Sequence, residues 1–367
     1  MQGDTRRRRR RPARLLPAAA VILAGLCPPL ADRAHAASPT AEEKRVDASV
    51  VRALKFLAQE QQRSGGWRLR SFRESTAATS LAVMAFLAAG HVPGEGPYGR
   101  PLENAVDWVL DHQVPIDGTK GRESVMLVNR ASGDSGMYSH GISTLMLAEV
   151  VGMLKKDRAR RCRGALEKAV RLILAAQGVR KSRRHAGGWR YKHTSVDSDL
   201  SVTGWQLLAL RAAKDVGCDV PKENIDRAVA YVTSCRARRG SRFAYQPFHS
   251  ASPTRTGTGI LCLEVCGKHK SPDVVRAADA LLRRPLHRRS SFFFYGVYYC
   301  TTGMFKVGGK HWEATKANTH ALLLGSQRQD GSWIHGGRER RYGPIYCTSM
   351  AVLALSVEYR YLPIYQR

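Results

Sequence analysis

The sequence predicts an all-α fold, an α6/α6 toroid in which six helical-hairpin repeats supply six inner and six outer helices. The first observation is a Gln followed by a Gly-containing turn that ends in Trp, which recurs as Gln59 to Trp67, Gln177 to Trp189 and Gln327 to Trp333. The second is that amphipathic stretches alternate with stretches that are apolar nearly all round. The third is the period of about 40–60 residues, which is typical of an array of repeats.

The first helix of each predicted pair has a single apolar face. Its apolar residues recur at i, i+3, i+4 and i+7, with Arg and Lys between them, which indicates a helix that is solvated on its far side. We expect these outer helices to begin near Val50, Glu103, Glu167, Asp226, Val274 and Ala314.

The second helix of each pair is apolar on nearly every face, and a helix of that kind is buried. We expect these inner helices to begin near Ser75, Ser139, Ser201, Thr254, Phe294 and Tyr342. An open solenoid needs polar terminal repeats. Because the last repeat is as apolar as the middle ones, the pattern predicts a closed ring.

Residues 1–36 have the pattern of a signal peptide. Arg6 to Arg11 form a charged region, Leu15 to Leu26 an apolar one, and Ala34-His35-Ala36 a cleavage site. An uncleaved membrane anchor is the alternative, although the apolar run is short for a membrane span. We therefore expect one toroid domain, residues 37–367, in a periplasmic or secreted protein.

The chain is strongly basic, with a formal net charge of +29. The leader carries eight arginines against two aspartates, so +23 remains outside it. Such a field attracts anionic lipid, acidic polysaccharide or nucleic acid. No nucleic-acid-binding module is visible and export argues against one. A solvated basic rim is the expected interpretation of these charges, and an acidic envelope surface as a partner is the alternative.

The Gln and Gly-x-Trp turns, each followed by a small-residue helix, resemble the repeats of squalene–hopene cyclases and of protein prenyltransferase β subunits. This is the terpenoid cyclase and prenyltransferase toroid superfamily, which includes prenyltransferase and squalene oxidase repeat proteins. The resemblance covers roughly residues 45–367. It implies a cavity lined by the starts of the inner helices and a lipid or isoprenoid ligand.

Two inner-helix starts carry candidate catalytic residues. Asp197-Ser198-Asp199 resembles the Asp-rich motif with which cyclases protonate a double bond, but the motif is incomplete here. Asp199 is thus either a cavity acid or a helix N-cap. His140 also stands at a helix start, where the dipole disfavours its cation, so it either accepts a proton or is a hydrogen-bonded core residue.

The metal positions of the prenyltransferases are not retained. The resemblance places zinc ligands at Tyr295, Val297 and Gly343, none of which is a zinc donor. A different set of donors, Cys262, Cys266 and His269, lacks the usual C-x-x-C arm. We therefore expect no metal and no cofactor. Seven cysteines lie outside the leader, and an odd number leaves at least one thiol free.

Aromatic side chains dominate what remains at the expected cavity mouth. They could hold a polyisoprenoid or stabilise a cation through their ring faces. The candidate ligand-binding residues are Tyr138, Asp197, Trp205, Tyr245, Tyr295, Tyr298, Tyr299, Trp312 and Tyr346.

The sequence is consistent with three functions. The first is an exported toroid that binds an apolar or isoprenoid-like ligand, or a partner, in its cavity without the standard acids or zinc. The second is a divergent isoprenoid- or terpenoid-processing enzyme, a cyclase or transferase that uses Asp199 and His140. The third is an envelope-associated scaffold with a basic rim.

Overall fold

The computed structural model describes residues 38–117, 123–133, 136–237 and 241–366. The chain divides into two compact units, Met1–Thr40 and Ala41–Arg367. The predicted signal peptide lies outside the described residues. Within them, no helix has both the length and the apolar content needed to cross a membrane.

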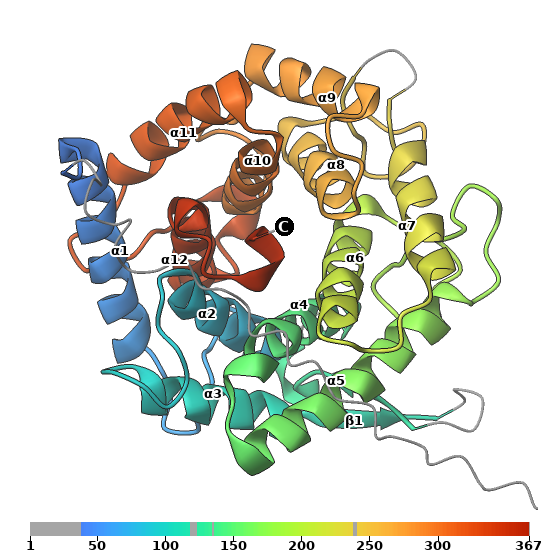
Figure 1. Ribbon diagram of the computed structural model, residues 1–367, viewed down its shortest axis with the longest axis horizontal. Helices are drawn as coiled ribbons and strands as arrows, with labels where there is room; N and C mark the ends of the chain where they lie inside the picture. The colour runs from blue at the N-terminus through green and yellow to red at the C-terminus, as the bar shows by residue number, and fades with distance from the viewer. Residues whose placement is uncertain (1–37, 118–122, 134–135, 238–240, 367) are drawn as a thin grey trace, which may run out of the picture. The chain divides into compact units, whose positions relative to one another are not determined.

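Twelve α-helices in the described residues form two concentric layers, so the unit Ala41–Arg367 is an α/α toroid (Figure 1). The outer helices are α1 (Ala41–Gln59), α3 (Gly99–Asp111), α5 (Lys156–Gln177), α7 (Lys222–Ser234), α9 (Pro272–Arg283) and α11 (Gly309–Leu324). The inner helices are α2 (Thr76–Ala88), α4 (Gly136–Val150), α6 (Leu200–Asp215), α8 (Pro253–Val265), α10 (Phe293–Val307) and α12 (Gly343–Leu355). This confirms the predicted fold class and the alternation of amphipathic and buried helices.

The ring closes on itself. Each inner helix packs against the next, and α12 packs against α2, while α1 packs against both α11 and α12. At this closing seam the ring of His320 on α11 hydrogen-bonds the carboxylate of Glu42 on α1 at 2.6 Å. The predicted closed ring is therefore confirmed.

The three Trp turns join the two helices of a repeat. The indole Nε1–H of each Trp donates to a carbonyl near the end of the preceding outer helix, and its backbone N–H donates to a Thr hydroxyl in the following inner helix. The indole bonds are Trp67 to Leu57 at 2.8 Å, Trp189 to Ile173 at 2.8 Å and Trp333 to Leu323 at 2.9 Å. The backbone bonds, to Thr79, Thr203 and Thr348, are each 3.0 Å. Each buried Trp therefore fixes the hairpin angle of its repeat.

The Gln of each turn clamps its repeat to the next outer helix. Its side-chain N–H donates both to a carbonyl of its own turn and to a carbonyl of the neighbouring helix. The clamps are Gln61 to Gly65 and Pro101, Gln177 to Gly187 and Asn224, and Gln327 to Gly331 and Ser49, at 2.8–2.9 Å. In the first repeat the Gln singled out from the sequence is not the clamping residue. Gln59 is the last residue of α1, and the clamp is made by Gln61, which precedes Trp67 by the same spacing as Gln327 precedes Trp333.

The clamps act at three of the six seams between repeats: between repeats one and two, three and four, and six and one. The three seams without a clamp are each bridged by side chains that include a carboxylate. Arg158 of α5 bonds Glu103 and Asp107 of α3 at 2.6 and 3.0 Å. Arg236, beside α7, bonds Asp273 of α9. His311 of α11 contacts Asp279 of α9 at 2.8 Å.

The ion pairs between α3 and α5 also explain why the third outer helix begins earlier than the sequence predicts. The sequence predicts that the third outer helix begins near Glu167, but α5 begins at Lys156. Its first turns are rich in Arg and show no apolar period. Arg158 and Arg161 instead bond the acidic side of α3, at Asp107 and Asp111, which stabilises the added turns.

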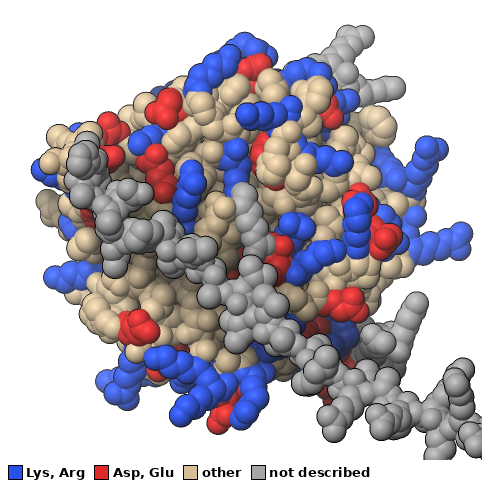
Figure 2. Space-filling model, viewed as in Figure 1, with Lys and Arg blue, Asp and Glu red and all other residues tan. Residues whose placement is uncertain are grey.

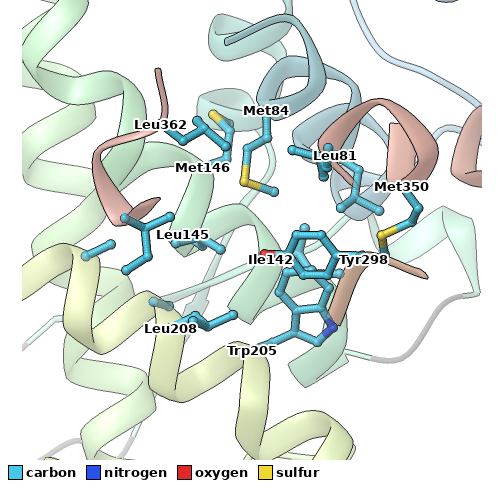
Figure 3. Packing of buried hydrophobic residues seen from close by; sticks show 14 of the residues in the cluster. Leu81, Met84, Ile142, Leu145, Met146, Trp205, Leu208, Tyr298, Met350 and Leu362 are labelled. Atoms are coloured by element: carbon cyan, nitrogen blue, oxygen red, sulfur yellow. The ribbon is translucent and has the colours of Figure 1, made fainter. Parts of the chain in front are cut away.

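The centre of the ring is filled by side chains. Figure 3 shows the inner-helix residues Leu81, Met84, Ile142, Leu145, Met146, Trp205, Leu208, Tyr298 and Met350 pointing toward one another, with Leu362 among them. All are nearly inaccessible to solvent. Because such low accessibility leaves no room for a water-sized void beside them, the centre is a packed core.

A C-terminal segment, residues 356–366, covers one end of this core (Figure 1). Its apolar members Leu362, Ile364 and Tyr365 are 1%, 6% and 3% exposed. The backbone N–H of Ile364 donates to Glu149 at the end of α4 (3.1 Å), and Lys306 of α10 donates to the carbonyl of Tyr365 (3.2 Å). The segment therefore seals the end at which the inner helices finish.

The opposite end of the ring, at which all six inner helices begin, consists of the longer connections. We call it the loop face; among the described residues it comprises 60–75, 112–117, 123–133, 178–199, 235–237, 241–252, 284–292 and 325–342. One connection contains an antiparallel hairpin that the sequence did not predict, β1 (Gln113–Ile116) with β2 (Ser124–Leu127). Its strands have only four residues each, and seven residues separate them in the sequence, more than the two-residue turn that an Asp-Gly pair such as Asp117-Gly118 typically marks.

Candidate functional site

The starts of the inner helices on the loop face bring most of the predicted site residues together. Asp199 is the N-cap of α6, and its Oδ1 accepts the backbone N–H groups of Ser201 and Val202, both at 2.9 Å. These bonds satisfy donors that a helix start leaves unpaired. The N-cap alternative from the sequence is therefore the observed arrangement.

The other oxygen of Asp199 lies near Arg190 and the Tyr245 side chain but makes no hydrogen bond of ordinary geometry with the described residues. The side chain is 0% exposed, and Oδ2 accepts no hydrogen bond in the described part of the chain. Arg190 Nη1, also without a hydrogen bond among the described residues, lies 3.9 Å from it. A buried carboxylate oxygen and guanidinium nitrogen with spare bonding capacity are costly to fold. Such a pair is typical of a place that receives a polar ligand atom.

Tyrosines and arginines surround this pair. The guanidinium of Arg190 lies over the rings of Tyr191 and Tyr245, 4.9 and 5.6 Å from their centroids, and Arg255 lies 5.3 Å from Tyr245. The hydroxyls of Tyr191 and Tyr245 hydrogen-bond each other. Asp197, half-buried, contacts Arg190 at 3.3 Å. The sequence analysis missed Arg190, Tyr191 and Arg255, although the first two directly follow the Trp189 turn.

Burial raises the pKa of Asp199 to about 6, and the Val202 N–H and Arg190 oppose that rise. In the unfolded chain an Asp has a pKa of about 3.9, so the folded protein holds this proton more tightly. The free energy of unfolding therefore falls as the pH rises from 4 to 6 and stays lower above that.

We expect Asp199→Asn to match the wild type near pH 4, because Asn also caps helices, and to be more stable at pH 7 by on the order of 2 kcal/mol. Urea unfolding of both proteins across this pH range measures the difference. A constant difference at all pH values would contradict the assignment.

Besides Tyr245, three of the predicted tyrosines lie in or beside this cluster. Tyr138 of α4 stacks with Tyr191 at 6.0 Å between centroids. The hydroxyl of Tyr295 donates to the carbonyl of Ser201 at 3.4 Å. Tyr346 of α12 stands beside Tyr342, with centroids 5.0 Å apart. Burial raises the pKa of all three predicted tyrosines above its ordinary value, so their hydroxyls are neutral donors.

The other predicted aromatic residues lie elsewhere. Trp205 stacks on Tyr298 with centroids 5.4 Å apart and also contacts Tyr299, and all three are at most 2% exposed within the core. Trp312 of α11 lies at the opposite end, where its Nε1–H donates to Glu358 at 3.1 Å. The structure therefore places Trp205 and Tyr298 in the core and Trp312 at the opposite end, while Tyr299 links the core to the cluster through Tyr295, with ring centroids 4.6 Å apart.

His140 is held by backbone groups on both sides. Its Nδ1 accepts the N–H of Leu127 (3.1 Å) at the end of β2, and its Nε2 contacts the carbonyl of Ala169 (3.1 Å) on α5. Burial lowers the pKa of His140 to about 4, so the ring is neutral near pH 7. With both nitrogens engaged, the arrangement favours the core-residue alternative, in which His140 ties the hairpin to the toroid.

A basic hollow of about 660 Å³ opens on the loop face. It is lined by Arg70, Ser71, Phe292, Gly337, Arg338, Arg340 and Arg341. None of the four arginines pairs with a carboxylate among the described residues. Burial lowers the pKa of Arg255, and the positive charge of Arg338 lowers it further. The hollow and the Asp199 cluster are therefore neighbours.

Glu339 does not neutralise the hollow, although it lies between Arg338 and Arg340 in the sequence. Its carboxylate is buried and accepts the backbone N–H groups of Phe294 (3.0 Å) and Tyr295 (3.1 Å) at the start of α10. Burial raises its pKa. Because this acid points inward to cap a helix, the arginines beside it leave an excess of positive charge in the hollow.

Positive charge is not confined to one place on the protein. Figure 2 shows Lys and Arg side chains spread over the visible face, with Asp and Glu among them. The net charge therefore does not locate a site. What distinguishes the loop-face hollow is that four arginines without an acidic partner among the described residues line one cavity.

The cysteines and the metal candidates form no site in the described part of the chain. All seven cysteines outside the predicted signal peptide are free thiols there, and six are buried. Within the same residues, no three His, Cys, Asp or Glu side chains are grouped so that they could hold a metal ion. His269 instead bonds Glu264 at 2.7 Å.

No family model matches the sequence, and a comparison with curated proteins finds no match. Solved structures do match the fold. The type II terpene cyclase MstE from Scytonema has a TM-score of 0.55 at 16% identity, with 87% of this chain and 100% of the cyclase covered. The alpha-1,6-mannanase GH76A of Salegentibacter sp. HEL1_6, in complex with alpha-1,6-mannotriose, has a TM-score of 0.59 at 9% identity, covering 85% and 98%.

A protein from Actinoplanes is also similar, with a TM-score of 0.53 at 14% identity and coverage of 84% and 98%. At these identities the likeness shows the fold alone, because one fold supports many activities. This chain is an α/α toroid. The structures support the toroid fold predicted from the sequence and do not single out a prenyltransferase and squalene oxidase repeat protein.

Proposed function

We propose that this protein is an exported prenyltransferase- and squalene-cyclase-like repeat protein that binds an amphiphilic ligand at its loop face. The ligand has an apolar, isoprenoid-like part and an anionic group. The protein binds it without the complete acid motif or the zinc ligands of its catalytic relatives. The observation that carries the proposal is the tyrosine and arginine cluster around Asp199, next to the basic hollow.

The location of the ligand follows from the packing. The centre of the ring is occupied by its own side chains, so the proposed ligand lies over the starts of α4, α6, α8 and α10. There Tyr138, Tyr245 and Tyr295 present ring surfaces that suit an unsaturated chain. The MstE cyclase from Scytonema has been solved with geranylgeranyl dihydroxybenzoate as substrate, which supports an isoprenoid ligand on a toroid of this type.

The anionic group is assigned to the hollow. Guanidinium groups form charge-assisted, often bidentate hydrogen bonds with phosphate and carboxylate. Arg338 and Arg341 stand on the side of the hollow next to aromatic rings, at 6.0 Å from Phe292 and 4.9 Å from Tyr342. A head group held there leaves the rest of the ligand free to cross toward Arg255 and the Asp199 cluster.

Mass spectrometry of an organic extract of the purified native protein tests the proposal. We expect a bound lipid in the wild type, and about a tenfold or greater loss of it in the double variant Arg338→Ser, Arg341→Ser, because each lost charge-assisted bond weakens binding by about that factor.

The matched control is Lys44→Ser, Arg45→Ser, which removes two exposed cations from α1. It should retain the lipid. An extract free of lipid would refute the proposal. Equal amounts of lipid in the wild type and in both variants would show that the ligand does not bind in the hollow.

A second candidate function is acid chemistry on an isoprenoid. It is favoured by the buried Oδ2 of Asp199 and by its pKa of about 6, which lets this carboxyl carry a proton in mildly acidic conditions. Incubating the protein with a polyisoprenoid and analysing the products tests it. Conversion that is lost in Asp199→Asn would support it, and unchanged polyisoprenoid would exclude it.

A further inference from the structure

We infer that the loop face rests on an anionic lipid bilayer and that two neighbouring loops, residues 178–199 and 245–252, insert apolar side chains among its headgroups. The inference deepens the proposed function, because a bilayer is the source from which an amphiphilic ligand would reach the hollow. We call these two loops the docking patch.

Exposed apolar side chains gather in the docking patch. Five large hydrophobic residues are exposed in the described part of the chain, and three of them lie here: Tyr191, Val196 and Phe248, at 40%, 68% and 66%. The other two, Val51 on α1 and Tyr361 in the C-terminal segment, are separate from each other and from the patch. Large exposed apolar side chains that cluster indicate a contact surface.

The two loops form one surface. The side-chain N–H of Gln246 donates to the carbonyl of Ser198 at 2.8 Å, and the N–H of Leu200 donates to the carbonyl of Tyr245 at 2.8 Å. Arg184 crosses from the first loop to the second, with its guanidinium 5.0 Å from the ring centroid of Phe248. Apolar and cationic groups therefore stand side by side.

The backbone at Phe248 is held in a conformation that a bulky residue rarely adopts. Its φ is +72°, in the left-handed region where glycine is favoured. Neither loop compensates by burying the ring, which stays exposed. Strained residues of this kind cluster at functional surfaces.

The charge of the patch selects an anionic partner. The longer loop carries six cations, Arg180, Lys181, Arg183, Arg184, Arg190 and Lys192. It has two acids: Asp197, which pairs with Arg190, and Asp199, which is buried. Residues 245–252 contain no acid. Basic residues at a bilayer surface are attracted to anionic headgroups, and adjacent apolar residues insert between them. An acidic polysaccharide would satisfy the cations but would leave Val196 and Phe248 in water.

Vesicle flotation with the full chain tests the inference. The protein should float with vesicles of phosphatidylcholine and phosphatidylglycerol, fail to float with phosphatidylcholine alone, and be released by added salt. The double variant Val196→Ser, Phe248→Gly should partition about tenfold less into the anionic vesicles. Glycine suits the backbone at position 248, so this variant should fold at least as well as the wild type.

Val51→Ser is the matched control, since Val51 is 63% exposed on an outer helix away from the patch. It should float like the wild type. The inference is overturned if the double variant floats as well as the control, if inorganic phosphate releases the protein where sodium chloride of equal ionic strength does not, or if alginate binds both proteins equally while vesicles bind neither. Because the vesicles contain no isoprenoid, a failure of the proposed ligand would leave this result unaffected.

Discussion

Gly187→Ala should lower the free energy of unfolding by roughly 3–5 kcal/mol, because two costs act at one position. The backbone there has a φ of +89°, where an added Cβ is strained. That Cβ would also lie 2.3 Å from the carbonyl oxygen of Arg227 in the next outer helix, far inside contact distance. Relief requires the two repeats to separate, which breaks the clamp that Gln177 makes to Gly187 and Asn224. Urea unfolding measures the loss.

Gly267→Ala separates the two costs. Gly267 also has a positive φ, +76°, but an added Cβ there meets no atom within 4 Å. This control should lose only about 1 kcal/mol, from backbone strain alone. Gly331→Ala should behave like Gly187→Ala, since its Cβ would lie 2.3 Å from the carbonyl oxygen of Arg52 across the closing seam. Equal losses at all three glycines would show that close approach between repeats does not matter.

Leu362→Ala should lower the free energy of unfolding by about 2–5 kcal/mol, the usual cost of removing a buried Leu from a rigid core. Leu362 is 1% exposed and belongs to the cluster at the centre of the ring. The inner helices are fixed by their hairpins and clamps, so they have little freedom to collapse into the space. Differential scanning calorimetry and urea unfolding both report the change.

The neighbouring Tyr361 provides the comparison for this experiment. It is 51% exposed, and Tyr361→Ala should change stability by no more than about 0.5 kcal/mol, as surface substitutions usually do. If both variants were neutral, the C-terminal segment would be a loose cover and not part of the core.

The fold could be predicted because helical periodicity depends only on residues that are close together in the sequence. The inner helices predicted near Ser75 and Thr254 begin at Thr76 and Pro253, since small polar caps and apolar runs mark them. The signals that were missed depend on distant residues. The start of α5 is stabilised by acids of α3, and the clamping role of Gln61 is visible only beside Pro101, far along the chain.

The candidate site was predictable only in part, for the same reason. Asp199 was identified as either a cap or an acid because capping is a local preference. Its contact with Arg190, and the approach of Tyr245 from the next repeat, arise from packing of separate loops. The aromatic residues show the limit clearly. Nothing in the local sequence distinguishes Tyr138, which reaches the loop face, from Trp205, which is packed in the core.

Neighbouring repeats are joined in two different ways. Salt and acid should therefore weaken some seams between repeats more than others. An amide-to-carbonyl clamp carries no net charge, so neither ionic strength nor mild acid acts on it directly. The seams bridged by Arg158, Arg236 and His311 rely on carboxylates, which salt screens and acid neutralises, with a loss of up to about 1 kcal/mol for each exposed pair. Salt or acid should therefore increase amide hydrogen exchange at those three seams first. The toroid would flex there as linked arcs, while the joints at Gln61 and Gln177 stay closed. The joint at Gln327 should respond to an intermediate degree, because the His320–Glu42 contact lies at the same seam.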